Sequence, residues 1–89
     1  MCVVVQKYGG TSVGSMERMR AVAERVQRTR QDGHQVVVVV SAMAGETDRL
    51  LGLARQASAT PAAREVDMLL ATGEMVAIAL VAMSLQELG

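Results

Sequence analysis

The 89-residue sequence contains no Trp or Phe, one Tyr, one Cys, one His and one Pro, and its 9 basic residues are balanced by 9 acidic ones. A single cysteine excludes an internal disulfide and is typical of a protein of the reducing cytoplasm. No pair of residues with metal-ligand spacing accompanies the lone His34, so we expect no metal site. Zero net charge without a basic cluster gives no general attraction to nucleic acids or to anionic membranes.

Long apolar runs are also missing. The longest runs from Met75 to Met83, and its nine residues fall short of the roughly 20 that cross a bilayer. Residues 1–7 have neither the basic start nor the cleavage site of a signal peptide. We therefore expect a cytoplasmic protein with no membrane partner. Because 51% of the residues are apolar, the chain can bury enough surface to fold.

The first half of the chain has the pattern of a strand followed by a helix. Residues 2–8 are β-prone and end at a glycine pair, which predicts a strand with Cys2 as a small buried residue. Apolar residues at helical spacing predict a helix over 15–31. Ser15 is the expected N-cap of this helix, and Gly33 is its expected stop.

A run of five valines, residues 36–40, has no polar face, which is typical of a parallel strand covered on both sides. With the preceding strand and helix, it predicts one right-handed βαβ unit over residues 2–41. Two strands do not make an independently stable sheet. We therefore expect the chain to be the N-terminal part of a larger α/β domain.

The second half is helical in character. We expect a short helix over 46–57, and then helix from Pro61 to the end of the chain, with Thr60 as its cap and a break at Thr72-Gly73. The last segment, Met75 to Leu88, is apolar around its whole circumference. A helix of this kind is expected to be buried on several sides.

The first candidate for chemistry is the stretch from Lys7 to Ser15, which links the first strand to the helix. Glycines here would let the backbone approach a phosphate, and Lys7 would lie at the carboxyl end of a parallel strand, where open α/β sheets bind ligands. The spacing fits neither the P-loop nor the dinucleotide fingerprint. The alternative is that Gly9-Gly10 is only a tight turn and Lys7 only a solvated charge.

Two further candidates lie downstream. Ser41 and Thr47 follow the valine strand and offer hydroxyl groups near the same sheet edge, or else satisfy backbone groups at a helix start. Glu74 follows the expected helix break, where its carboxylate would face a cationic ligand group or complement the helix N-terminus.

The order and spacing of three motifs resemble the aspartate kinases over nearly the whole chain. The motifs are KYGGTSVG at 7–14, VVVVSAMAGETD at 37–48 and EVDMLLATGE at 65–74. The resemblance implies the amino-acid kinase fold, a three-layer α/β/α sandwich with a mainly parallel sheet. It also implies that residues 1–89 are the N-terminal part of the catalytic domain, without the nucleotide-binding half or the regulatory domains.

The same resemblance implies transfer of the ATP γ-phosphoryl group to the side-chain carboxylate of L-aspartate, which leads to lysine, threonine and methionine. It implies that Lys7 is catalytic and binds the ATP phosphates with Tyr8, Gly9 and Gly10. By the same resemblance, Ser41 and Thr47 would contact aspartate, and Glu74 would pair with its α-ammonium group. Mg²⁺ would be bound with ATP, and the longer parent protein would be oligomeric.

Two alternatives remain open at this point. One is another member of the family that acts on glutamate, acetylglutamate or carbamate. The other is a non-catalytic fragment whose apolar helix, Met75 to Leu88, docks on a partner. Under the aspartate kinase hypothesis, the 89 residues alone are expected to be inactive.

Overall fold

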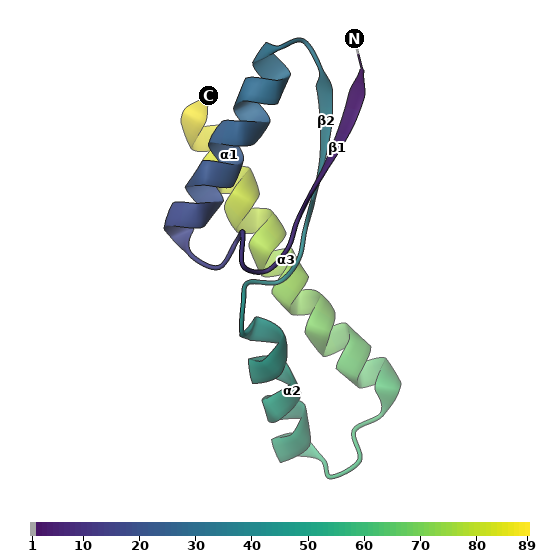
Figure 1. Cartoon of the computed structure of the whole chain (residues 1–89). Coiled ribbons are helices and arrows are strands. Elements are labelled where there is room, and N and C mark those ends of the chain that lie inside the picture. The colour runs from purple at the N-terminus through teal and green to yellow at the C-terminus, as the bar shows by residue number, and fades with distance from the viewer. Residues whose placement is uncertain (1) are drawn as a thin grey trace.

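The computed structural model describes residues 2–89, which form two parallel strands and three helices (Figure 1). In chain order they are β1 (Val3–Tyr8), α1 (Met16–Gln31), β2 (Gln35–Val40), α2 (Glu46–Ala57) and α3 (Ala63–Leu88). The molecule measures 51 × 25 × 18 Å. It is elongated because α2 and the first half of α3 extend away from α1 and the sheet (Figure 1).

The predicted strand, helix and strand are confirmed to within one residue at each end. The two strands pair in parallel, with Tyr8 opposite Val40. Helix α1 begins after Ser15, whose hydroxyl oxygen accepts a hydrogen bond from the backbone N–H of Arg18 at 3.2 Å. It ends at Gln31 with Asp32 as its C-cap, and Gly33 follows with a φ of 92°. The expected cap and stop are therefore both present.

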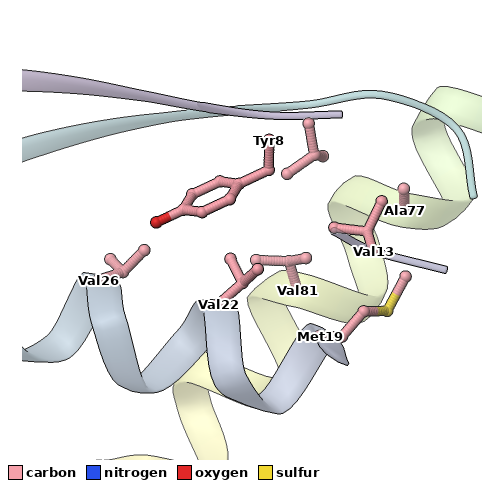
Figure 2. Packing of buried hydrophobic residues seen from close by; sticks show 8 residues of the cluster. Tyr8, Val13, Met19, Val22, Val26, Ala77 and Val81 are labelled. Atoms are coloured by element: carbon pink, nitrogen blue, oxygen red, sulfur yellow. The ribbon is translucent and has the colours of Figure 1, made fainter. Parts of the chain in front are cut away.

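One face of the sheet packs against α1 and α3. Figure 2 shows the ring of Tyr8 reaching from β1 toward Val22 and Val26 of α1, with Val81 of α3 beside them. Burying these apolar side chains is the main favourable contribution to folding in a chain of this size. The parallel sheet with flanking helices is confirmed, and the three-layer sandwich stays a prediction.

The other face of the sheet is uncovered in residues 2–89. Its valines, 3, 5, 37 and 39, are between 44% and 66% exposed. The expectation that the valine strand is covered on both sides is therefore met on one side only. Cys2 is exposed rather than buried, and it lies just before the first residue of β1. The prediction for Cys2 was wrong.

Helix α3 differs from its prediction in two ways. It begins at Ala63, after Ala62 as N-cap, rather than at Pro61, and it runs without a break through Thr72-Gly73. The predicted break was wrong because Gly73 is buried against neighbouring segments, and this packing compensates for its low helix propensity. In the last segment, only Ala77 and Val81 are buried, so the expected burial on several sides is not found within residues 2–89.

Because α3 is uninterrupted, it also has to be compared with a membrane-spanning helix. Helix α3 is long and apolar enough to cross a bilayer, with a window of mean hydropathy 2.0 of which 17% is buried. The core helix of a soluble protein passes the same test of length and composition. Gly73, Ala77 and Val81 form the buried stripe along which α3 packs against its neighbours.

Candidate functional site

Three segments meet at the carboxyl ends of the two strands: the loop after β1, the loop after β2 and the middle of α3. The backbone joins the two loops, because Ser41 N–H donates to the Tyr8 carbonyl and Ala44 N–H donates to the Gly10 carbonyl, each at 3.1 Å. In open α/β sheets this edge is where ligands bind. The fold therefore brings together the first two candidate segments of the sequence.

Gly10 is where the two loops come closest. A Cβ atom at this position would lie 2.9 Å from the carbonyl oxygen of Ala42, a distance that no larger residue tolerates without moving the backbone. A Cβ atom at Gly9 would meet nothing within 4 Å. Packing among the described residues therefore explains the glycine at position 10, whereas position 9 faces open space.

The loop itself is held from both ends. Ser12 N–H donates to the Gly9 carbonyl at 3.0 Å and closes a turn. The Arg18 guanidinium, from the first turns of α1, donates to the Thr11 carbonyl at 2.8 Å. These bonds fix the course of the backbone between β1 and α1, so the expected tight turn is present whether or not the loop binds a ligand.

Lys7 and Tyr8 lie on opposite faces of β1. Lys7 is exposed, on the uncovered face, with Val39 as its register partner on β2. Tyr8 is only 8% exposed, and its phenol donates to the Gln6 side-chain oxygen at 2.7 Å. Of the two, only Lys7 has a side chain that is accessible at the strand end. Tyr8 joins the loop after β2 through its backbone carbonyl.

Gln6 was not among the predicted site residues. Its side-chain N–H donates to the Thr29 hydroxyl of α1 at 2.9 Å. The signal was present in the alternation of β1, because Gln6 falls on the same face as Val4 and Tyr8. A polar residue in a register that faces a helix points to a specific partner on that helix.

Ser41 and Thr47 lie on either side of the start of α2. Ser41 is half-buried, and Thr47 is exposed in the first helical turn. The N-cap is Gly45, which has no side chain and a φ of 82°. Neither hydroxyl-bearing residue is therefore the N-cap, and the alternative that assigned them to this role loses its support.

An ion pair stabilises the start of α2 beside Thr47. The Arg49 guanidinium donates to the Glu46 carboxylate, with 3.1 Å between Nε and Oε2. This hydrogen bond lowers the pKa of Glu46; burial opposes the shift, and the positive charge of Arg49 adds to it. The same bond raises the pKa of Arg49. The pair orients Glu46 along the first helical turn.

Glu74 lies in the middle of α3, one residue after the point where α3 touches the other two segments. A Cβ atom at Gly73 would lie 3.2 Å from Ala42 Cβ and 3.4 Å from Glu46 Cγ. Glu74 itself is exposed. Because it is not at a helix N-terminus, the alternative that its charge complements the helix dipole is wrong, since that effect fades after the first turn.

A groove of about 580 Å³ runs between β1 and α1. Two of the predicted site residues, Lys7 and Tyr8, line it, together with Gln6, Ser12 and residues of α1 that include Arg18 and Arg25. Within residues 2–89, no group of three His, Cys, Asp or Glu side chains is placed to hold a metal ion.

Comparison with known proteins identifies relatives that agree with one another. The model of the amino acid kinase family matches residues 3–89. The aspartokinase of Geobacillus stearothermophilus is 61% identical over all 89 residues, which are 22% of that protein, and aspartokinase 2 of Bacillus subtilis is 57% identical over the same residues and also 22% covered. The crystal structure of the aspartate kinase from Synechocystis superposes with a TM-score of 0.93 at 58% identity.

These matches cover nearly all of this chain but only a small part of each relative. The Synechocystis superposition covers 97% of this chain but 15% of that one. The chain spans about a fifth of the length of the curated relatives it matches.

Proposed function

The chain belongs to the amino acid kinase family, and from this premise we propose that it is the N-terminal part of an aspartate kinase. The longer protein would transfer the γ-phosphoryl group of ATP to the side-chain carboxylate of L-aspartate and form 4-phospho-L-aspartate, the entry to lysine, threonine and methionine. The observation that carries the proposal is the convergence of the loop after β1, the loop after β2 and Gly73 at one sheet edge.

In this proposal Lys7 is the catalytic cation. A carboxylate nucleophile needs no general base, so the protein has to bring two anions together and reduce their repulsion. An exposed ammonium group at the carboxyl end of β1 can do this for the transferring phosphoryl oxygens. Gly9 supports the role, because the open space around it leaves room for a phosphate against the backbone. Gly10 and Tyr8 contribute through the backbone of the same loop.

Ser41, Thr47 and Glu74 form the aspartate side of the proposed site. The two hydroxyl groups would bind the carboxylates of the substrate, and Glu74 would pair with its α-ammonium group. A site that presents a carboxylate discriminates strongly against a substrate without the amine, because the carboxylate is then left unpaired. The contact of Gly73 with the loop after β2 supports this grouping, since it brings the α3 backbone beside Ala42 and Glu46.

Several partners of the longer protein belong to the same proposal. Mg²⁺ would bind with the ATP phosphates and add positive charge there. We also propose a cytoplasmic, oligomeric enzyme in which the remaining four fifths of the length of the relatives supply the nucleotide-binding half.

A hybrid enzyme tests the proposal. We would replace the matching segment of the Geobacillus stearothermophilus aspartokinase by these 89 residues and call the product the hybrid. The expected result is ATP-dependent formation of aspartyl phosphate, trapped as its hydroxamate, at a rate within about tenfold of the parent. Circular dichroism and size-exclusion chromatography would establish that the hybrid is folded.

The same hybrid separates the alternatives. A folded hybrid with no activity on aspartate would overturn the proposal, and so would activity on glutamate in place of aspartate. If the segment were a non-catalytic interaction fragment, the hybrid would bind neither substrate, which isothermal titration calorimetry measures directly.

A further inference from the structure

We propose that Gln6 is a positioning residue for Lys7, acting through a chain of side-chain hydrogen bonds that ties β1 to α1. This inference rests on the proposed function. The Tyr8 phenol donates to Gln6 Oε1 at 2.7 Å, and Gln6 Nε2 donates to Thr29 Oγ1 at 2.9 Å. The Thr29 hydroxyl in turn donates to the Arg25 carbonyl at 3.1 Å. This series of hydrogen bonds therefore ends on the backbone of α1.

These hydrogen bonds affect Lys7 because of its position in the strand. Lys7 lies between Gln6 and Tyr8, and both neighbours are held on the face that packs against α1. Within residues 2–89, β1 has a hydrogen-bonded neighbour strand on one edge only. A rotation of β1 about its own axis would move the Lys7 ammonium group, and the bond from Gln6 to α1 resists that rotation.

The identity of residue 6 supports the same conclusion. Val4 lies on the same face of β1, so an apolar side chain can also occupy a position on this face. A half-buried amide has to be desolvated, which is unfavourable unless its donor and acceptor are both satisfied. Gln6 satisfies both, with partners on two different elements. Directional bonds of this kind fix geometry, whereas apolar contacts allow a strand to slide.

Tyr8 extends the restraint to the substrate loops. Its phenol holds Gln6, and its carbonyl accepts the hydrogen bond from Ser41 N–H at 3.1 Å. One residue thus couples the end of β1 to α1 on one side and to the loop after β2 on the other. Loss of the Gln6 amide would loosen Lys7 relative to Ser41.

The test uses the hybrid with Gln6→Met, Thr29→Val and the double variant. Gln6→Met keeps the length of the side chain but removes both hydrogen bonds. Gln35→Met is the matched control, because Gln35 is an exposed glutamine at the start of β2. We expect kcat to fall about tenfold in Gln6→Met, in keeping with the sensitivity of catalysis to small misplacements. The KM values for ATP and aspartate should stay within about twofold, and the double variant should be no slower than Gln6→Met alone.

A second measurement does not depend on activity. Hydrogen exchange of the peptide spanning residues 3–10 should be faster in Gln6→Met than in Gln35→Met or the unsubstituted hybrid. Unchanged exchange would overturn the proposal even if the hybrid were inactive, which would itself contradict the proposed function. An unchanged kcat in Gln6→Met, an equal loss in Gln35→Met, or a loss confined to KM would also overturn it.

Discussion

At the scale of single residues, Lys7 is the side chain on which the proposed reaction depends most. It is the only lysine of the sequence, and it is exposed at the end of β1 beside a glycine that faces open space. We expect Lys7→Met in the hybrid to lower kcat by about 10² to 10³, the usual effect of removing a group that stabilises transition-state charge. Steady-state kinetics with ATP and aspartate would measure it.

The control for this prediction is Arg55→Met, which removes one exposed positive charge from the last turn of α2. It should leave kcat within about twofold, because the group lies far along α2 from the strand ends and its field is screened by solvent. Undiminished turnover in Lys7→Met would contradict the role given to Lys7. Equal losses in both variants would indicate a general effect of charge.

From the sequence we predicted that the loop after β1 and the loop after β2 lie at one edge of the sheet, and the backbone hydrogen bonds between them confirm this placement. The direction of the side chains was not predictable. Alternation puts Lys7 and Tyr8 on opposite faces of β1 but does not say which face a helix covers. The five consecutive valines of β2 offer no polar side to decide the matter. Gln6 was overlooked for the same reason.

At the scale of elements, α3 shows where local propensity fails. A glycine inside a helix is unfavourable by roughly 1 kcal/mol relative to alanine, and for that reason a break was predicted at Thr72-Gly73. The helix continues because Gly73 is the point where it crosses Ala42 and Leu50, within 3.3 Å of where a Cβ atom would lie. This contact joins residues far apart in the sequence, so no local pattern reveals it.

Two helical glycines make this argument testable. Gly52 lies inside α2 with nothing within 4 Å of a Cβ atom, whereas Gly73 is enclosed. Gly52→Ala in the hybrid should raise the free energy of unfolding by about 0.5 to 1 kcal/mol through helix propensity alone. Gly73→Ala gains the same propensity but has to displace its neighbours, so its net change should be smaller or negative. Urea unfolding measures both.

The two variants also differ in their expected kinetics. Gly73→Ala should raise the KM for aspartate, because the contact holds the loop after β2 beside α3. Gly52→Ala should leave this KM unchanged. Equal stabilisation by both substitutions, with no change in KM, would show that the close contact at Gly73 has no energetic consequence.

At the scale of the whole molecule, the described residues leave large apolar surfaces uncovered. The outer face of the sheet is lined by valine, and Met75, Val76, Ile78 and Met83 of α3 are each about half or more exposed. Contiguous patches of this kind are rare on independent soluble monomers. The expectation of a larger domain came from the same reasoning at the sequence level, where two parallel strands with both faces to cover do not make an independently stable sheet. In the proposed longer protein, these surfaces would be covered by segments whose sequence is not among these residues, so the covering elements could not be predicted.

Polar substitutions on the outer sheet face should be favourable in the 89 residues alone and unfavourable in the hybrid. We would replace Val3, Val5, Val37 and Val39 by threonine, which keeps the branched shape and the strand propensity but adds a hydroxyl group. In the 89 residues alone, where these side chains are exposed, the change should reduce self-association in sedimentation experiments. In the hybrid it should lower the free energy of unfolding by about 1 kcal/mol or more per residue, because the hydroxyl groups would then be buried. Threonine at four exposed positions of α1, Arg18 excluded, is the control. It should leave self-association unchanged and lower the free energy of unfolding by no more than the helix propensity of threonine, about 0.7 kcal/mol per residue or less. Unchanged stability of the hybrid would mean that this face stays exposed to water in the longer protein, and the expected second helical layer over the sheet would then be wrong.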